Sequence, residues 1–182
     1  MTRSDHGAGG GSLARDLAKG AVAGTIATFV LDRVDWFLHD LEPEEARRRT
    51  WAVRPEGKDP AHVIASRASE ALGGEPLPQD HLAGHLTHYA IGIAPVLAYA
   101  ALRERFPAVT AGRGLAFGLA ISLLEDETLN PALGLSAGPR AYPWQAHARG
   151  LASHLVYGLV AEAVLGALSS DENRSLPKRP AA

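Results

Sequence analysis

The chain has 182 residues, of which 46% are apolar and 21% are charged, and its formal net charge is −2. This balance argues against a nucleic-acid-binding protein, because binding to phosphates requires concentrated Lys and Arg. The sequence contains no cysteine, which excludes disulfides, thiolate metal sites and a cysteine nucleophile. The length fits one domain, and the mean hydropathy of −0.05 averages over apolar and polar stretches.

The two ends of the chain are polar. Residues 1–16 are Gly-rich and lack the order of basic, apolar and small residues that marks a cleavable signal. Residues 169–182 are low in apolar side chains. We therefore expect a flexible leader in 1–16, a single four-helix domain in 17–168 and a flexible tail in 169–182.

Four segments of helical length are rich in Ala, Leu and Gly and lack period-2 alternation, namely 17–38, 84–103, 112–130 and 147–168. This pattern predicts four long helices. Between the first two, Asp59 is a suitable N-cap, Pro60 suits the first helical position and Gly73 and Gly74 end the segment. The predicted fold is an all-α, four-helix up-down bundle with a short extra helix in the first long loop.

The lengths of these segments lie between the about 20 apolar residues that cross a bilayer and the shorter helices of soluble proteins. Small residues four apart, as in Gly20/Gly24 and Gly114/Gly118, favour close helix packing in lipid. We predict a transmembrane bundle in a lipid bilayer, with both termini cytoplasmic because basic residues are slightly more frequent on that side. A soluble bundle that binds partners through its apolar stripes is the alternative, and the Gly-rich faces also offer contacts for a homo-oligomer.

Polar and small residues share one face of each segment, at spacings of three, four and seven residues. In an up-down bundle these stripes meet at one end, with Glu162 lying deeper. The expected members of this polar cluster are Asp32, Asp35, His88, Glu125, Asp126, His154 and Glu162. His147 lies on the same face as His154.

Three interpretations of the cluster stay open. The first is structural, with His and carboxylates pairing at helix ends. The second is a site for Zn, Fe or Mn, since carboxylates and imidazoles from several helices form such sites. Its candidate ligands are Asp35, His85, His88, Glu125 and His154. The third is proton handling, because His titrates near neutrality and buried His and acids form relays.

The sequence contains no serine-hydrolase elbow and no phosphate-binding loop. We therefore do not predict an enzyme.

A set of short motifs follows the start of the second helix: Thr87-His88, Phe106-Pro107, Pro131-Ala-Leu-Gly-Leu135, Tyr142-Pro143-Trp144, His154-Leu155-Val156 and Glu162. Their order over residues 82–168 resembles the YagU-like family of small bacterial inner-membrane proteins, which has no assigned biochemical activity. The resemblance implies a four-helix protein of the bacterial inner membrane, loosely associated with acid tolerance, and it singles out His88, His154 and Glu162. The acidic residues Asp32, Asp35 and Glu125–Glu127 depart from the family pattern.

Overall fold

A computed structural model describes residues 8–103 and 105–175 of the chain, with side chains described for 14–103 and 105–170. This part of the chain consists of helices and loops, with no strand. The prediction of an all-helical fold is therefore confirmed. The elements are α1 (Ala8–Leu41), α2 (Glu44–Ala52), η1 (Pro55–Gly57), α3 (Pro60–Ala71), α4 (Leu82–Leu102), η2 (Pro107–Thr110), α5 (Leu115–Ile121), η3 (Ser122–Leu129), α6 (Asn130–Ala132), η4 (Pro139–Ala141) and α7 (Trp144–Ser175).

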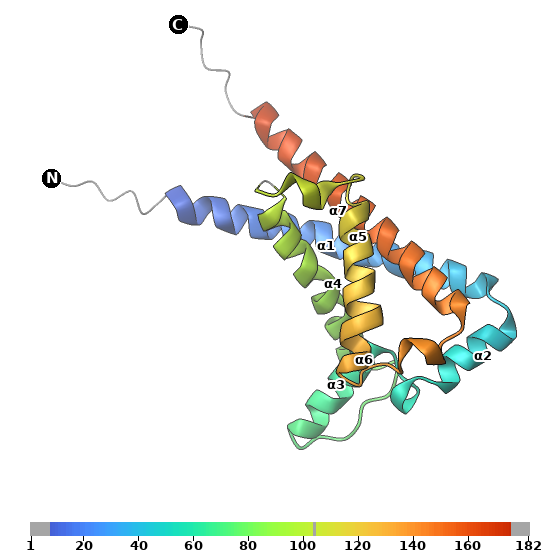
Figure 1. Ribbon diagram of the computed structural model, residues 1–182. Coiled ribbons are helices and arrows are strands. Elements are labelled where there is room, and N and C mark those ends of the chain that lie inside the picture. Colours follow the sequence, from blue (N-terminus) through green and yellow to red (C-terminus); the bar gives the residue numbers. More distant parts are fainter. Residues whose placement is uncertain (1–7, 104, 176–182) are drawn as a thin grey trace, which may run out of the picture.

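The long helices pack in antiparallel pairs. α1 packs against both α4 and α7, α5 packs against α7, and the short helix α3 packs against α4. Figure 1 shows that α1, α4, α5 and α7 cross one another at oblique angles. The finer prediction of a regular up-down bundle stays a prediction.

The short helix α3 begins and ends where the sequence predicted. Asp59 is its N-cap and accepts a hydrogen bond from the backbone N–H of His62, and Pro60 occupies the first helical position. Gly73 follows the helix with a φ of +82°, a conformation that glycine adopts without the steric cost of a side chain. Local turn chemistry thus places this helix correctly.

The boundaries of the predicted domain differ from those of the helices. α1 begins at Ala8, so residues 8–16 of the predicted leader are helical, and α7 continues to Ser175. Leu13, Ala14 and Arg15 are strong helix formers, whereas the glycines at 9–11 are weak ones, so helix propensity accounts for only part of the N-terminal extension. The rest of the predicted leader and tail lies outside the described residues.

The third long segment is not a plain α-helix. Gly114, with a φ of +94°, is the N-cap of α5, and from Ser122 the helix continues as the π-helix η3. π-Helices are rare and occur often at functional sites. Glu125, Asp126 and Glu127 all lie on η3.

Many large apolar side chains face outward, and the core combines small residues with Val96, Tyr99, Tyr157 and Leu165. Ala23, Ala27 and Ala161 are fully buried. Phe29 and Leu86, by contrast, are 51% and 63% exposed. In a water-soluble protein the larger apolar residues are the ones most often buried.

Glycines bring the helix backbones together. Gly24 of α1 lies against Ile93 of α4, and Gly118 of α5 lies against the backbone of His154 on α7. Gly20 and Gly114 make similar contacts with α4 and α7. These faces are therefore occupied within the chain, and the homo-oligomer predicted through them stays a prediction.

Two helices of the described part are long and apolar enough to cross a membrane, by length and composition alone. They are α4 and the Trp144–Ser170 part of α7. In both, few residues of the apolar stretch are buried inside the molecule.

Candidate functional site

Two histidine–carboxylate pairs connect the long helices near the end where α4 and α7 begin. His88 Nε2 of α4 lies 2.8 Å from Asp32 Oδ1 of α1. His154 Nδ1 of α7 lies 3.3 Å from Asp126 Oδ2 of η3 and 2.9 Å from the carbonyl oxygen of Gly150. Each pair therefore joins two different helices through an imidazole and a carboxylate.

Glu125 lies on η3 next to Asp126 and is close enough to His154, Asp126 and His88 to interact with them electrostatically. We call Asp32, His88, Glu125, Asp126 and His154 the His/acid layer. All five were predicted members of the polar cluster.

His147, at the start of α7, is held between two oxygen acceptors. Its Nδ1 lies 2.6 Å from Glu127 Oε1, and its Nε2 lies 2.9 Å from the carbonyl oxygen of Pro139. A carbonyl accepts but never donates, so Nε2 must carry a proton. The bond to Glu127 then requires a second proton, either on Nδ1 or on the carboxyl group. The complete arrangement therefore holds one proton more than a neutral histidine beside an ionised glutamate.

Asp35 belongs to a different group from the His/acid layer. Arg149 of α7 donates to Asp35 Oδ2 at 2.6 Å and to Glu42 Oε1 at 2.8 Å. The Arg149 and Glu42 side chains are only 10% and 6% exposed. A guanidinium keeps its charge at all physiological pH values, so Arg149 permanently offsets one negative charge of the Asp35 and Glu42 pair.

Glu162 also lies apart from the layer, further along α7. Arg103 donates to both carboxylate oxygens of Glu162, at 2.6 and 3.2 Å, and the Tyr99 hydroxyl donates to Oε2 at 2.6 Å. We call Tyr99, Arg103 and Glu162 the arginine triad. Tyr99 stacks on Phe117, which stacks in turn on Tyr157. The structure does not join Glu162 to His154, because the hydrogen bonds of Glu162 go to Tyr99 of α4 and to Arg103, which follows α4.

The five predicted metal ligands do not come together. His88 pairs with Asp32, Asp35 with Arg149, and His154 with Asp126. The ring of His85 packs edge-on against His62, with centroids 4.9 Å apart. Among the residues that the structure describes, no group of three or more His, Asp or Glu side chains is arranged to hold a metal ion. The predicted Zn, Fe or Mn site thus receives no support.

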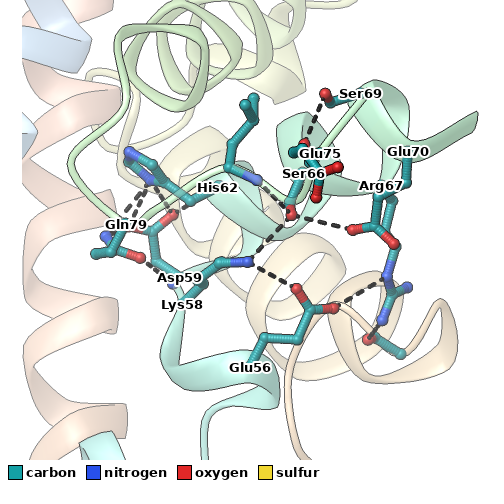
Figure 2. Close-up of polar contacts among 12 residues, drawn as sticks. Glu56, Lys58, Asp59, His62, Ser66, Arg67, Ser69, Glu70, Glu75 and Gln79 are labelled. Carbon is teal, nitrogen blue, oxygen red and sulfur yellow. Dashed lines mark hydrogen bonds and ion pairs between the residues drawn. The ribbon is translucent and has the colours of Figure 1, made fainter. Parts of the chain in front are cut away.

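A second polar cluster surrounds α3, outside the four long helices (Figure 2). The Lys58 ammonium donates to Glu56 Oε2 at 2.9 Å and to Ser66 Oγ at 3.0 Å. A lysine beside a serine hydroxyl can act as a base in catalysis. Ser66 is fully buried, however, and its oxygen also accepts a hydrogen bond from the Leu77 amide. The pair is closed to a substrate and holds the loop after α3 in place.

Asp59 connects the same cluster to α4. Its carboxylate accepts hydrogen bonds from the backbone and the ring of His62 and from the side chain of Gln79. Burial acts to raise the pKa of Asp59, but the hydrogen bonds from Gln79 and His62 outweigh it, and the pKa lies below its usual value. The ring of His62 fits against Gly84, where a side chain on α4 would block it.

The sequence reasoning missed several partners of the predicted residues. Arg149, Glu42, Glu127 and Arg103 were not among the predicted site residues, although each bonds to a His, Asp or Glu of one of these groups. One signal was available for Arg149, since three carboxylates near the end of the first helix require a cation. Arg103 is the last residue of the predicted segment 84–103, and spacing alone does not show that its side chain reaches Glu162.

The chain matches no family model, no curated protein and no solved structure.

Proposed function

We propose that this chain is a polytopic protein of a lipid bilayer whose His/acid layer and His147 respond to protons. The distribution of side chains carries the membrane part of the proposal. Small residues make up much of the interior, beside Val96, Tyr99, Tyr157 and Leu165, whereas many Leu, Ile and Phe side chains of the long helices face outward. Such an arrangement is costly in water and favourable in hydrocarbon, where close contact of small residues stabilises helix pairs.

The aromatic residues support the same placement. The sequence has three tryptophans, Trp36, Trp51 and Trp144, and they lie near the C-terminus of α1, on α2 and at the first residue of α7. Trp36 and Trp144 are 56% and 72% exposed. Tryptophan is enriched at membrane–water interfaces. We therefore place this end of the helices at one membrane surface, with α2 and α3 outside the bilayer.

Localisation and family are further parts of the proposal. The resemblance to YagU-like proteins supports the bacterial inner membrane, and the frequency of basic residues supports cytoplasmic termini. In that orientation α3 lies on the periplasmic side, and the pairs His88–Asp32 and His154–Asp126 lie toward the same side. Membrane fractionation tests this: recovery of folded protein in the soluble fraction without detergent would contradict the proposal.

His147 carries the proton part of the proposal. Its two ring nitrogens face two acceptors, so the native hydrogen bonds need an extra proton, and loss of that proton removes one of them. The pairs His88–Asp32 and His154–Asp126 join helices through the same chemistry. Acidification and neutralisation should therefore change how firmly η3 and α4 are held against α7 and α1.

The experiment is a profile of thermal unfolding midpoint against pH, from about pH 5 to 7.5, in detergent. We expect the midpoint of the wild-type protein to change across this range. The change should shrink in His147→Gln and in the double variant His88→Gln/His154→Gln. His81→Asn is the control, because His81 is an exposed N-cap of α4 and Asn caps equally well. A flat wild-type profile would overturn the proton response.

A further inference from the structure

The outward face of α1 carries a stripe of exposed apolar side chains. Val22, Ile26 and Phe29 are exposed, and their spacing of four and three residues places them on one side of the helix. Lys19 and Arg33 continue the same spacing at the two ends of the stripe. These two cations are about 21 Å apart along the helix, at 1.5 Å per residue. The stripe therefore consists of large apolar residues bounded by a cation at each end.

Arg33 points away from the polar interior of the molecule. The neighbouring Asp32 bonds to a histidine of α4 inside the molecule, whereas the Arg33 guanidinium lies over the Phe29 ring, 5.3 Å from its centroid. The positions three and four residues before and after Arg33 hold no acidic residue, and two of them are the exposed aromatics Trp36 and Phe37. Within the described part of the chain, Arg33 has no carboxylate partner. Its charge therefore stands alone on an apolar and aromatic face.

A charged side chain that faces hydrocarbon is costly, and arginine avoids this cost by extending its charged end to the membrane surface. Trp36, which we place at that surface, follows Arg33 by about 4.5 Å along the helix. Arg33 is exposed, so its long side chain can turn from Phe29 toward this level. The acceptors there are lipid phosphates, and a guanidinium binds phosphate oxygens through two parallel hydrogen bonds.

We propose that Arg33 and Trp36 form a binding site for the phosphate of an anionic phospholipid, with an acyl chain of that lipid lying along the apolar stripe. The inference rests on the proposed placement of α1 in a bilayer. The guanidinium supplies the charge, and the exposed indole N–H of Trp36 supplies a further donor. In a zwitterionic lipid the ammonium group of the headgroup offsets the phosphate charge. A cation without an acidic neighbour therefore favours the anionic lipid.

Quenching of Trp36 fluorescence by brominated lipids tests the site in the full chain. The variant Trp51→Phe/Trp144→Phe leaves Trp36 as the one tryptophan of the sequence. It is placed in nanodiscs of equal amounts of phosphatidylglycerol and phosphatidylcholine, with bromine on the acyl chains of one lipid or of the other. We expect an excess of phosphatidylglycerol at Trp36 of about fivefold, as the attraction of one arginine to an anionic surface produces.

Variants of single arginines show whether Arg33 causes the preference. Arg33→Gln should abolish it, and Arg33→Lys should keep only part of it, since an ammonium lacks the paired donors of a guanidinium. Arg48→Gln is the matched control, because Arg48 is also exposed but pairs with Glu44 on α2. It should leave the preference at Trp36 unchanged.

The possible failures of this experiment have different meanings. Equal quenching of Trp36 by both lipids, or a preference that persists in Arg33→Gln, would overturn the lipid site and leave the bilayer placement intact. Absence of quenching at Trp36, with quenching at Trp144 in the corresponding single-tryptophan variant, would show that protein covers this face and would also overturn the site. Absence of quenching at both residues would contradict the bilayer placement itself, and the site with it.

Discussion

The His/acid layer and the arginine triad both involve α4 and α7, but they contain different kinds of cation. Both take a residue from α4 and another from α7, and both contain carboxylates within an apolar protein. In the triad the cation is a guanidinium, which does not lose its proton, and a tyrosine hydroxyl completes the bonding of Glu162. In the layer the partners are imidazoles, whose charge changes near neutrality. We therefore propose that the identity of the cation, rather than burial, decides whether a contact is permanent or responds to protons.

The largest effect is expected when the triad loses its cation. Arg103→Ala leaves the Glu162 carboxylate uncompensated, and we expect a loss of about 3 kcal/mol in the free energy of unfolding. Asp32→Asn in the layer replaces one acceptor with another and should cost about 1 kcal/mol. Reversible unfolding in mixed detergent measures both. Similar losses of unfolding free energy at the two sites would contradict the difference between the guanidinium contact of the triad and the imidazole contacts of the layer.

Replacing both charges separates the contribution of packing from that of charge. Arg103→Leu combined with Glu162→Leu should restore much of the stability lost in Arg103→Ala, because no unpaired charge remains.

The contact between α5 and α7 provides the next largest effect. A side chain at Gly118 would meet the backbone of His154, so Gly118→Ala should cost about 1–3 kcal/mol and move His154 away from Asp126. Gly166 is the matched control on α7, since nothing lies within 4 Å of a Cβ at that position. Comparing the unfolding free energies of the two variants checks this prediction. A Gly166→Ala variant as unstable as Gly118→Ala would contradict it.

His147→Gln should alter the pH dependence of stability more than stability itself. The slope of the unfolding free energy against pH measures the difference in bound protons between the two states, about 1.4 kcal/mol per pH unit for one proton. We expect the variant to show a flatter slope between about pH 5 and 8 than the wild type. An unchanged slope would show that the pair with Glu127 holds no additional proton in the folded protein.

The smallest effect is expected at Asp59, which lies outside the long helices and serves as a reference. Its folded pKa is lowered, so its ionised form stabilises the fold above the unfolded pKa of about 3.9, and this stabilisation is lost as the pH falls through the folded value. Asp59→Asn keeps a good N-cap and should cost less than about 1 kcal/mol at neutral pH.

Amide hydrogen exchange in α3 at acidic and at neutral pH checks this. The wild-type amides should exchange faster on acidification after correction for intrinsic rates, and the variant should lose most of this dependence. An identical acid response in both proteins would rule out the carboxylate as its source.

Much of the fold follows from local chemistry in the sequence. The apolar segments predicted the long helices, and Asp59, Pro60 and Gly73 predicted the limits of α3. The same local signals did not predict the π-helix over Ser122–Leu129. Its residues, such as Leu123 and Leu124, also suit an α-helix, so tertiary contacts decide between the two kinds of helix.

The candidate site was predictable only in part. Helical spacing placed His88, Asp126 and His154 on the correct faces, since residues three or four apart share a side. It did not show which carboxylates a cation would reach, because long side chains such as those of Arg103 and Arg149 span a turn or more. Asp35 and Glu162 were therefore grouped with the histidines, although arginines neutralise both.

The most direct test of the central claim is the ring ¹⁵N spectrum of protein labelled at histidine, recorded in lipid nanodiscs between about pH 5 and 8. Signals assigned through His88→Gln, His147→Gln and His154→Gln should change from one protonation state to another across this range. Glu162→Gln should leave these changes intact, because the triad is separate. Ring signals that keep one protonation state from pH 5 to 8 would contradict a layer that responds to protons.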